Sequence, residues 1–209
     1  IGIRLPYQEM KTVIVDEQGQ YVRDCRTDEI GLVVIKGPNV FPGYLQEEYN
    51  KSIWVTEGWL STGDLGRQDK DGYFWLTGRA KELIIRGGHN IDPATIEGPL
   101  YRHPAVALAA AVGRPDPYAG EVPMAYIVLK EGAEAAEEEI LEYCKESIGE
   151  PMAVPKEIVF LERMPTTLVG KVFKPELRWD AVRRVYEREL AALKAEGLAE
   201  EVTVRVGEH

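Results

Sequence analysis

Three short motifs carry side chains, or bare main chain, that suit ligand chemistry. Asp64 ends a Thr-Gly-Asp corner, where its carboxylate can accept a pair of hydroxyl groups. Arg79 follows a glycine at the end of an aromatic-rich segment, and its planar guanidinium suits phosphate or ribose oxygens. Gly87-Gly88 presents main chain without side chains, so a narrow ligand can pass close to it. Asp64 and Arg79 flank one predicted hairpin.

Each motif also has a simpler interpretation. An aspartate in such a corner commonly caps a turn, and a lone arginine is commonly a surface charge. Gly87-Gly88 is also typical of an ordinary turn before a helix. Judged by spacing alone, Lys171 is a solvated loop lysine, and His89 considered alone is a structural histidine.

The elements that must position these residues fall into two groups. The first part of the chain predicts short strands, at Thr12–Val15, Gly31–Lys36 and Tyr73–Thr77, separated by Gly, Pro and Asp turns. The one helical turn expected there runs over residues 46–51. Short strands with frequent turns of this kind predict a small β-barrel or sandwich.

After Lys81 the pattern predicts a compact α+β domain with the order β-α-β-β-α-β. Its strands are expected at Leu83–Ile85, Ala105–Val112, Met124–Leu129 and Glu157–Leu161. Asp92-Pro93 predicts a helix start, with aspartate as the N-cap and proline in the first turn. Gly98-Pro99 predicts that this helix is short or kinked.

Two further helices are predicted. Glu137–Ile148 is amphipathic, with its glutamates on the outer face, and His103-Pro104 before it predicts a helix-ending turn with no catalytic role. Trp179 to about Leu198 predicts a long charged helix, which is a candidate surface for homo-oligomer formation. The apolar positions of this terminal helix are Val182, Val185, Leu190 and Leu193.

Composition limits the classes of partner. The formal net charge of -10 over 209 residues disfavours a nucleic-acid surface, because both partners would be negative. No apolar run approaches the roughly 20 residues of a membrane span. The two cysteines, Cys25 and Cys144, form no disulfide framework or zinc spacing, so we expect a cytoplasmic protein and no metal ligands in this chain. The chain begins at Ile1 rather than Met, so we expect it to be part of a longer protein.

The order and spacing of several motifs identify a family resemblance. The motifs are Thr62-Gly-Asp64, Asp69-Lys-Asp-Gly-Tyr73, Gly78-Arg-Ala-Lys-Glu82, Gly87-Gly-His-Asn-Ile-Asp-Pro93 and Pro165-Thr-Thr-Leu-Val-Gly-Lys171. In this order they resemble the adenylate-forming superfamily, which includes acyl-CoA synthetases, adenylation domains and firefly-type luciferases. The resemblance extends to about Arg178.

The resemblance implies a fold and a set of domains. Residues 1–80 look like the small β-barrel that ends the large N-terminal domain of these enzymes, and Lys81 falls at the hinge. Residues 81–178 look like the mobile C-terminal α+β domain, followed by a terminal helix and tail over 179–209. The family's phosphate loop, adenine-contacting motif and acyl pocket all lie upstream of the part that this chain resembles.

The resemblance also implies residue roles. Lys171 looks like the catalytic lysine, which places a cation between the substrate carboxylate and the α-phosphate of ATP. Asp64 looks like the carboxylate that accepts the ribose hydroxyls, and Arg79 like its nucleotide-binding partner. Gly87-Gly88-His89 looks like the loop that lines the channel for the pantetheine arm of CoA. Magnesium would enter with ATP, on ligands outside this chain.

The sequence therefore predicts the C-terminal fragment of an ATP-dependent acyl-CoA synthetase, inactive by itself. Such an enzyme uses a carboxylic acid, ATP and CoA, and the segment from Gly170 to Pro175 resembles variants in fatty-acid and cyclic-acid CoA ligases. Two alternatives stay open. One is an adenylation domain serving a carrier protein, or a luciferase-like oxygenase. The other is a non-catalytic interaction module, against which Asp64, Arg79 and Lys171 together argue.

Overall fold

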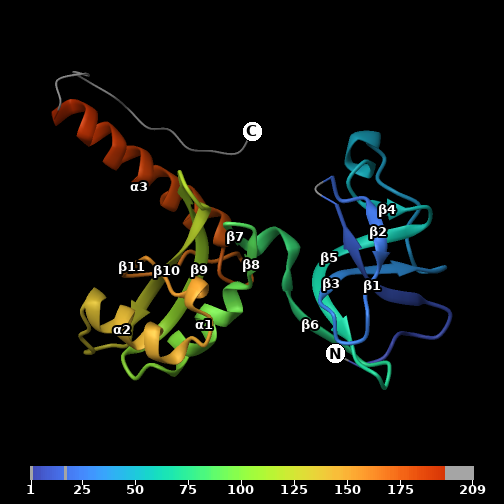
Figure 1. Ribbon diagram of the computed structural model, residues 1–209, viewed down its shortest axis with the longest axis horizontal. Helices are drawn as coiled ribbons and strands as arrows, with labels where there is room; N and C mark the ends of the chain where they lie inside the picture. The colour runs from blue at the N-terminus through green and yellow to red at the C-terminus, as the bar shows by residue number, and fades with distance from the viewer. Residues whose placement is uncertain (1, 17, 196–209) are drawn as a thin grey trace. The chain divides into compact units, whose positions relative to one another are not determined.

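The computed structural model describes residues 2–16 and 18–195. The chain forms two compact units, Ile1–Glu82 and Leu83–His209, each with its own sheet (Figure 1). Lys81, the predicted hinge residue, is the second-last residue of the first unit and lies in the short 3-10 helix η2, Ala80–Glu82. Its side chain is exposed to solvent.

The first unit is an antiparallel sheet with the strand order β2-β1-β3-β5-β4, in which β6 also pairs with β5. A small apolar core, formed by Val13, Leu32, Val34 and Val55, holds the sheet together. A 3-10 helix, η1 (Glu47–Asn50), lies close to the helical turn predicted there. The strands are β1 (Glu9–Val15), β2 (Tyr21–Asp24), β3 (Gly31–Lys36), β4 (Trp54–Thr56), β5 (Trp59–Gln68) and β6 (Phe74–Arg79).

The prediction that this unit is a β-barrel is wrong. Within residues 2–16 and 18–82 no pairing connects β2 to β4 or β6, so the sheet stays open. The second edge of β5 is divided between the short β4 at one end and β6 at the other. A closed barrel needs continuous pairing around its circumference, and all four residues of β2 are exposed at the far edge.

The second unit is a sheet with the order β11-β10-β7-β8, in which β9 pairs with β10. Only β10 and β11 run parallel to each other, and the α+β fold class is confirmed. The strands are β7 (Ile84–Arg86), β8 (His89–Ile91), β9 (Val106–Asp116), β10 (Gly120–Leu129) and β11 (Glu157–Phe160). The helices are α1 (Pro93–Arg102), α2 (Glu137–Ser147), the 3-10 helix η3 (Pro151–Ala153) and α3 (Lys174–Ala195).

Helices cover both faces of this sheet, because its central strands are apolar on both sides. Along β10, Ala125 and Ile127 pack with residues of α1 and α2, such as Ile96 and Ile140. Met124 and Tyr126 point to the opposite face and pack with α3. The continuous apolar runs predicted as strands are thus explained by burial on two faces.

The helices begin where the sequence predicts or earlier. Asp92 caps α1 by accepting a hydrogen bond from Ala94 N at 2.9 Å. The helix is 10 residues long, continues through Gly98-Pro99 to Arg102 and buries Pro99. His103 forms the C-cap, which confirms the predicted end of the helix.

The terminal helix differs from its prediction. It starts at Lys174, before the predicted Trp179, and it buries Leu177 and Ala181 rather than the four predicted apolar positions. The predicted end near Leu198 and the tail that follows lie outside the described residues. The difference arises because only the first part of α3 packs against the sheet, where Leu177 and Ala181 face Met124 and Tyr126.

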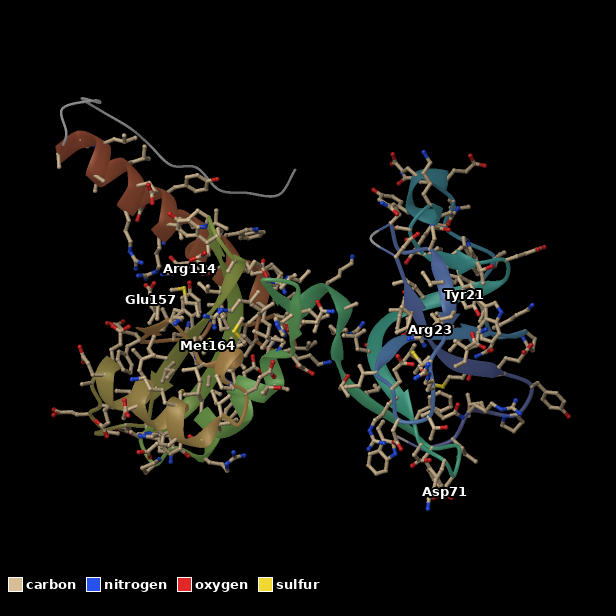
Figure 2. The ribbon with its side chains drawn as sticks, in the orientation of Figure 1. Tyr21, Arg23, Asp71, Arg114, Glu157 and Met164 are labelled. Carbon is tan, nitrogen blue, oxygen red and sulfur yellow. The ribbon has the colours of Figure 1, made fainter. Side chains whose placement is uncertain are left out.

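Ionic and polar contacts hold α3 against the sheet. Glu157 on β11 accepts a hydrogen bond from Arg114 Nη1 on β9 at 2.7 Å (Figure 2). It also pairs with Arg188 on α3. Tyr126 Oη donates to Asp180 Oδ2 at 2.9 Å, and burial raises the pKa of this phenol. Burial alone would raise the pKa of the Glu157 carboxyl, but hydrogen bonds from Arg188 and Arg114 outweigh it and lower that pKa.

We predict that Glu157→Gln destabilises the second unit by about 2 kcal/mol at neutral pH, because a charge-assisted hydrogen-bond network is lost. The folded-state pKa of Glu157 lies below the ordinary 4.5. The ionised carboxylate therefore contributes stability that is present above pH 4.5 and is lost as the pH falls through the folded-state pKa. The difference in free energy of unfolding between native protein and variant should therefore shrink below pH 4.5. Urea unfolding at several pH values, followed by circular dichroism, measures it. A difference that does not change with pH would contradict this account.

Candidate functional site

Asp64 lies in a bulge at the centre of the first unit's sheet. In the pairing of β5 with β3, Thr62, Gly63 and Asp64 together stand opposite the single residue Val33. Thr62 Oγ1 donates to Val33 O at 2.9 Å and accepts from Asp64 N at 3.1 Å. Gly63 has a φ of 74°, a conformation that favours glycine. The Thr-Gly-Asp sequence thus builds a bulge that redirects the Asp64 side chain.

Arg79 meets Asp64 across the β5–β6 pairing. The two residues are register partners, and Arg79 Nε lies 2.8 Å from Asp64 Oδ1. Arg79 Nη1 also donates to Thr62 O at 3.5 Å. The Arg79 side chain is 60% exposed and that of Asp64 is 25% exposed. An ion pair so exposed stabilises the fold little. Because of the same exposure, both groups are accessible to a ligand.

The hairpin that brings this pair together is closed by Asp69. Its carboxylate accepts hydrogen bonds from the backbone N–H of Asp71 and Tyr73, at 3.0 and 2.9 Å. It also accepts from Trp75 Nε1 at 2.8 Å, and this bond is the largest cause of a lowered Asp69 pKa. The Asp-x-Asp-Gly-Tyr motif is therefore a turn whose first aspartate organises the backbone.

Gly87 and Gly88 form the two-residue turn between β7 and β8. Their φ angles are 55° and 83°, and Arg86 pairs with His89 across the turn. Positive φ at both positions is the feature of a type I′ turn, which glycine favours. A Cβ added to either glycine would meet nothing within 4 Å. The turn conformation thus accounts for both glycines, and the turn, with His89, is exposed.

Lys171 lies in a closed hairpin loop between Met164 and α3. Thr167 N donates to Lys171 O at 2.7 Å, and Lys171 N donates to Thr167 Oγ1 at 3.2 Å. Gly170 has a φ of 79°, as the tight turn requires. A bridge between Thr166 and Val172 continues the hairpin below the loop. The Lys171 side chain is exposed to solvent.

The structure brings together two of the predicted site residues, Asp64 and Arg79. Lys171 and the glycine turn belong to the second unit. Two residues without a predicted role, Glu97 and Lys174, form an ion pair beside the Lys171 hairpin. No sequence signal pairs residues so far apart in the chain, although Lys174 follows the Lys171 motif closely.

Within residues 2–16 and 18–195, no three His, Cys, Asp or Glu side chains gather in an arrangement that could hold a metal ion. None of the described helices has the length and hydropathy needed to cross a membrane.

Comparison with known proteins agrees with this arrangement. Residues 95–171 match the family of the AMP-binding enzyme C-terminal domain. Marinolic acid–CoA ligase of Pseudoalteromonas sp. (strain SANK 73390) is 50% identical over 92% of this chain and 30% of its own length. Long-chain-fatty-acid–CoA ligase of Bacillus subtilis is 39% identical over 71% of this chain and 26% of its own.

Solved structures give the same result. ATP-bound MatB from Rhodopseudomonas palustris is 32% identical with a TM-score of 0.76, and the match covers 85% of this chain and 35% of that one. O-succinylbenzoate CoA synthetase from Bacillus subtilis, in complex with ATP and magnesium ion, is 37% identical with a TM-score of 0.70. That match covers 84% of this chain and 35% of that one.

Taken with the site geometry, these similarities define an AMP-binding enzyme C-terminal domain preceded by a β-sheet unit. The chain belongs to the adenylate-forming enzymes, of which it is a C-terminal portion related to acyl-CoA synthetases. It spans about 30% of the length of the first curated relatives that it matches.

We predict that Gly63→Ala destabilises the first unit by about 1 to 2 kcal/mol, because alanine is strained at this positive φ. Gly98→Ala is the matched control, since a Cβ there meets nothing within 4 Å and the backbone is helical. It should instead stabilise α1 by up to about 1 kcal/mol. Thermal unfolding of both variants measures the two signs, and equal effects would contradict the bulge geometry.

Proposed function

We propose that the intact protein is an ATP-dependent acyl-CoA synthetase. It would convert a carboxylic acid and ATP to an acyl adenylate and pyrophosphate, and then transfer the acyl group to CoA with release of AMP. The observation that carries this proposal is the accessible Asp64–Arg79 pair, held at 2.8 Å by a bulge. The relatives named as acid–CoA ligases support it.

Asp64 and Arg79 are proposed to bind the nucleotide. A carboxylate accepts hydrogen bonds from adjacent hydroxyls, so Asp64 would hold the 2′- and 3′-hydroxyls of the ribose. Arg79 adds a fixed cation beside it, suited to ribose and phosphate oxygens. Their ion pair orients both groups before the nucleotide arrives.

Lys171 is proposed as the catalytic residue of the first half-reaction. The attacking carboxylate and the α-phosphate are both anions, and they repel each other on approach. An ammonium group between them stabilises the transition state more than the separated substrates, which is what accelerates the reaction. The second half-reaction starts from an activated acyl phosphate, so a thiol can attack it without Lys171.

The remaining residues receive roles that depend on the second half-reaction. The exposed turn Gly87-Gly88-His89 would line the channel for the pantetheine arm of CoA, since its glycines offer backbone without side chains. Lys81, exposed at the end of the first unit, would be the hinge between residues 1–80 and the domain over 81–178. Residues 179–209 would form the terminal helix and tail. Magnesium would arrive with ATP on ligands outside this chain.

A different acceptor is the second candidate. The amide bond synthetase McbA from Marinactinospora thermotolerans is 32% identical with a TM-score of 0.70 over 85% of this chain. In this second proposal, an amine or the thiol of a carrier protein attacks the acyl adenylate in place of CoA. We place the intact protein in the cytoplasm, where a homo-oligomer through the terminal helix is a further expectation.

We predict that Lys171→Ala in the full-length protein lowers the rate of pyrophosphate release by at least about 100-fold, since one preorganised charge is lost. Thioester formation from supplied acyl adenylate should change less than about twofold, because that step does not use the lysine. Single-turnover assays measure the two steps separately. Equal loss in both would contradict the role given to Lys171.

Arg79→Ala should weaken ATP binding by about tenfold, the effect of losing one or two hydrogen bonds to a charged group. Arg67→Ala is the matched control, because Arg67 on the same strand pair makes an ion pair with Asp28 rather than with Asp64. Isothermal titration of the full-length protein with ATP compares the two. Unchanged affinity in Arg79→Ala would remove this residue from the site.

A further inference from the structure

The hairpin that presents Lys171 has both of its ends fixed in the second unit. Met164 enters it from a buried position, with 2% of its surface exposed, in the cluster that also holds Leu177 (Figure 2). Phe173 N donates to Pro165 O at 2.9 Å, which closes the base of the hairpin. The tip is fully open, since Leu168 is exposed. The loop therefore projects from a rigid base.

An ion pair lies at the second of these ends. Lys174, the first residue of α3, places its Nζ 2.9 Å from Glu97 Oε1 on α1. Both side chains are mostly buried, with 15% of Lys174 and 19% of Glu97 exposed. The same oxygen of Glu97 accepts a hydrogen bond from Ala111 N on β9 at 2.8 Å. Glu97 is therefore fixed by two donors from two different elements.

The pair connects elements that pack on opposite faces of the sheet. Helix α1 belongs to one buried cluster and the start of α3 belongs to the other. Strand β9 pairs with β10 alone among the strands of the described residues, so its other edge is unpaired. Glu97 satisfies an N–H group on β9, and Lys174 reaches the same carboxylate from α3. The contact thus links α1, β9 and the end of the Lys171 hairpin.

We propose that Glu97 and Lys174 are positioning residues for Lys171. Their ion pair fixes the backbone three residues after Lys171 to the sheet, and so sets where the ammonium group stands when the hairpin meets the nucleotide. This inference rests on the proposed function of Lys171. Displacement of a reacting or stabilising group by about 1 Å can cost a rate factor of roughly 100, so a loosened base affects catalysis before it affects folding.

The fold alone does not need a charged pair at this position. Glu97 could satisfy Ala111 N without Lys174, and an apolar side chain could cover the same stretch of α1. Replacing both partners of a partly buried ion pair with apolar groups changes stability little, whereas removing Lys174 alone leaves the Glu97 carboxylate without its cation and lowers stability as well. The rates of the two half-reactions, measured separately, therefore distinguish a change in position from a general loss of stability.

The test uses Lys174→Met, Lys174→Arg and the control Lys145→Met in the full-length protein. Methionine keeps the apolar stem of the lysine and removes its charge, whereas arginine keeps the charge. Lys145 forms a comparable pair with Glu142 at 2.8 Å, but on the exposed surface of α2. Pyrophosphate release and thioester formation from supplied acyl adenylate are measured separately for each variant.

We expect Lys174→Met to lower the rate of adenylate formation by about tenfold while the KM for ATP and the thioester step change less than about twofold. Lys174→Arg should restore most of the rate, and Lys145→Met should match the native protein. The double variant Glu97→Gln/Lys174→Met should lose no more adenylation rate than the product of the two single losses, since both substitutions break the same contact. An unchanged adenylation rate in Lys174→Met would overturn the inference, as would an equal loss in both steps.

A parallel assay of Lys171→Ala separates this inference from the proposed function. If Lys171→Ala keeps full adenylation, the function proposed for that lysine fails first. If Lys171→Ala loses adenylation and Lys174→Met does not, only the positioning role fails. Hydrogen exchange of the hairpin amides, such as Gly170 N and Phe173 N, gives a readout independent of activity. It should become faster in Lys174→Met and stay unchanged in Lys145→Met, and equal rates in all variants would overturn the inference.

Discussion

The second unit depends on burial of β10 on both of its faces. Met124, Ala125, Tyr126 and Ile127 are all fully buried, and they alternate between the α1–α2 layer and the α3 layer. One strand therefore contributes side chains to both apolar clusters, which also include residues of α1, α2 and α3. The Lys171 hairpin follows β11, the parallel neighbour of β10, and ends at α3. The position of Lys171 within the second unit thus depends on the packing of this sheet.

Local signals were enough to predict much of the fold. Asp92-Pro93 starts α1 because capping and a proline in the first turn act within a few residues. The apolar runs predict β9, β10 and β11 because strands buried on both faces leave such runs in the sequence. Asp64 and Arg79 were placed together because a short turn makes them neighbours on adjacent strands. These features depend on contacts that are close in the chain.

Features that depend on distant contacts could not be predicted in this way. Closure of the first sheet would require β2 to pair with the opposite edge, and the described residues show no such pairing. No local sequence pattern could predict whether these two edges pair. The start of α3 depends on Leu177 meeting Met124 from another part of the chain. The Glu97–Lys174 pair is likewise visible only after α1 and α3 have packed. The motif around Lys171 predicted a catalytic lysine by resemblance, and the hairpin that supports it came from the structure.

The central proposal is that Asp64 and Arg79 bind the nucleotide, and that Lys171 acts in acid activation by the intact enzyme. Pyrophosphate release by the full-length protein, across aliphatic, aromatic and cyclic acids with and without CoA, tests it most directly. The account predicts release that depends on one class of acid, with a thioester formed only when CoA is present. Absence of release with every class of acid, under conditions where ATP binds, would contradict it.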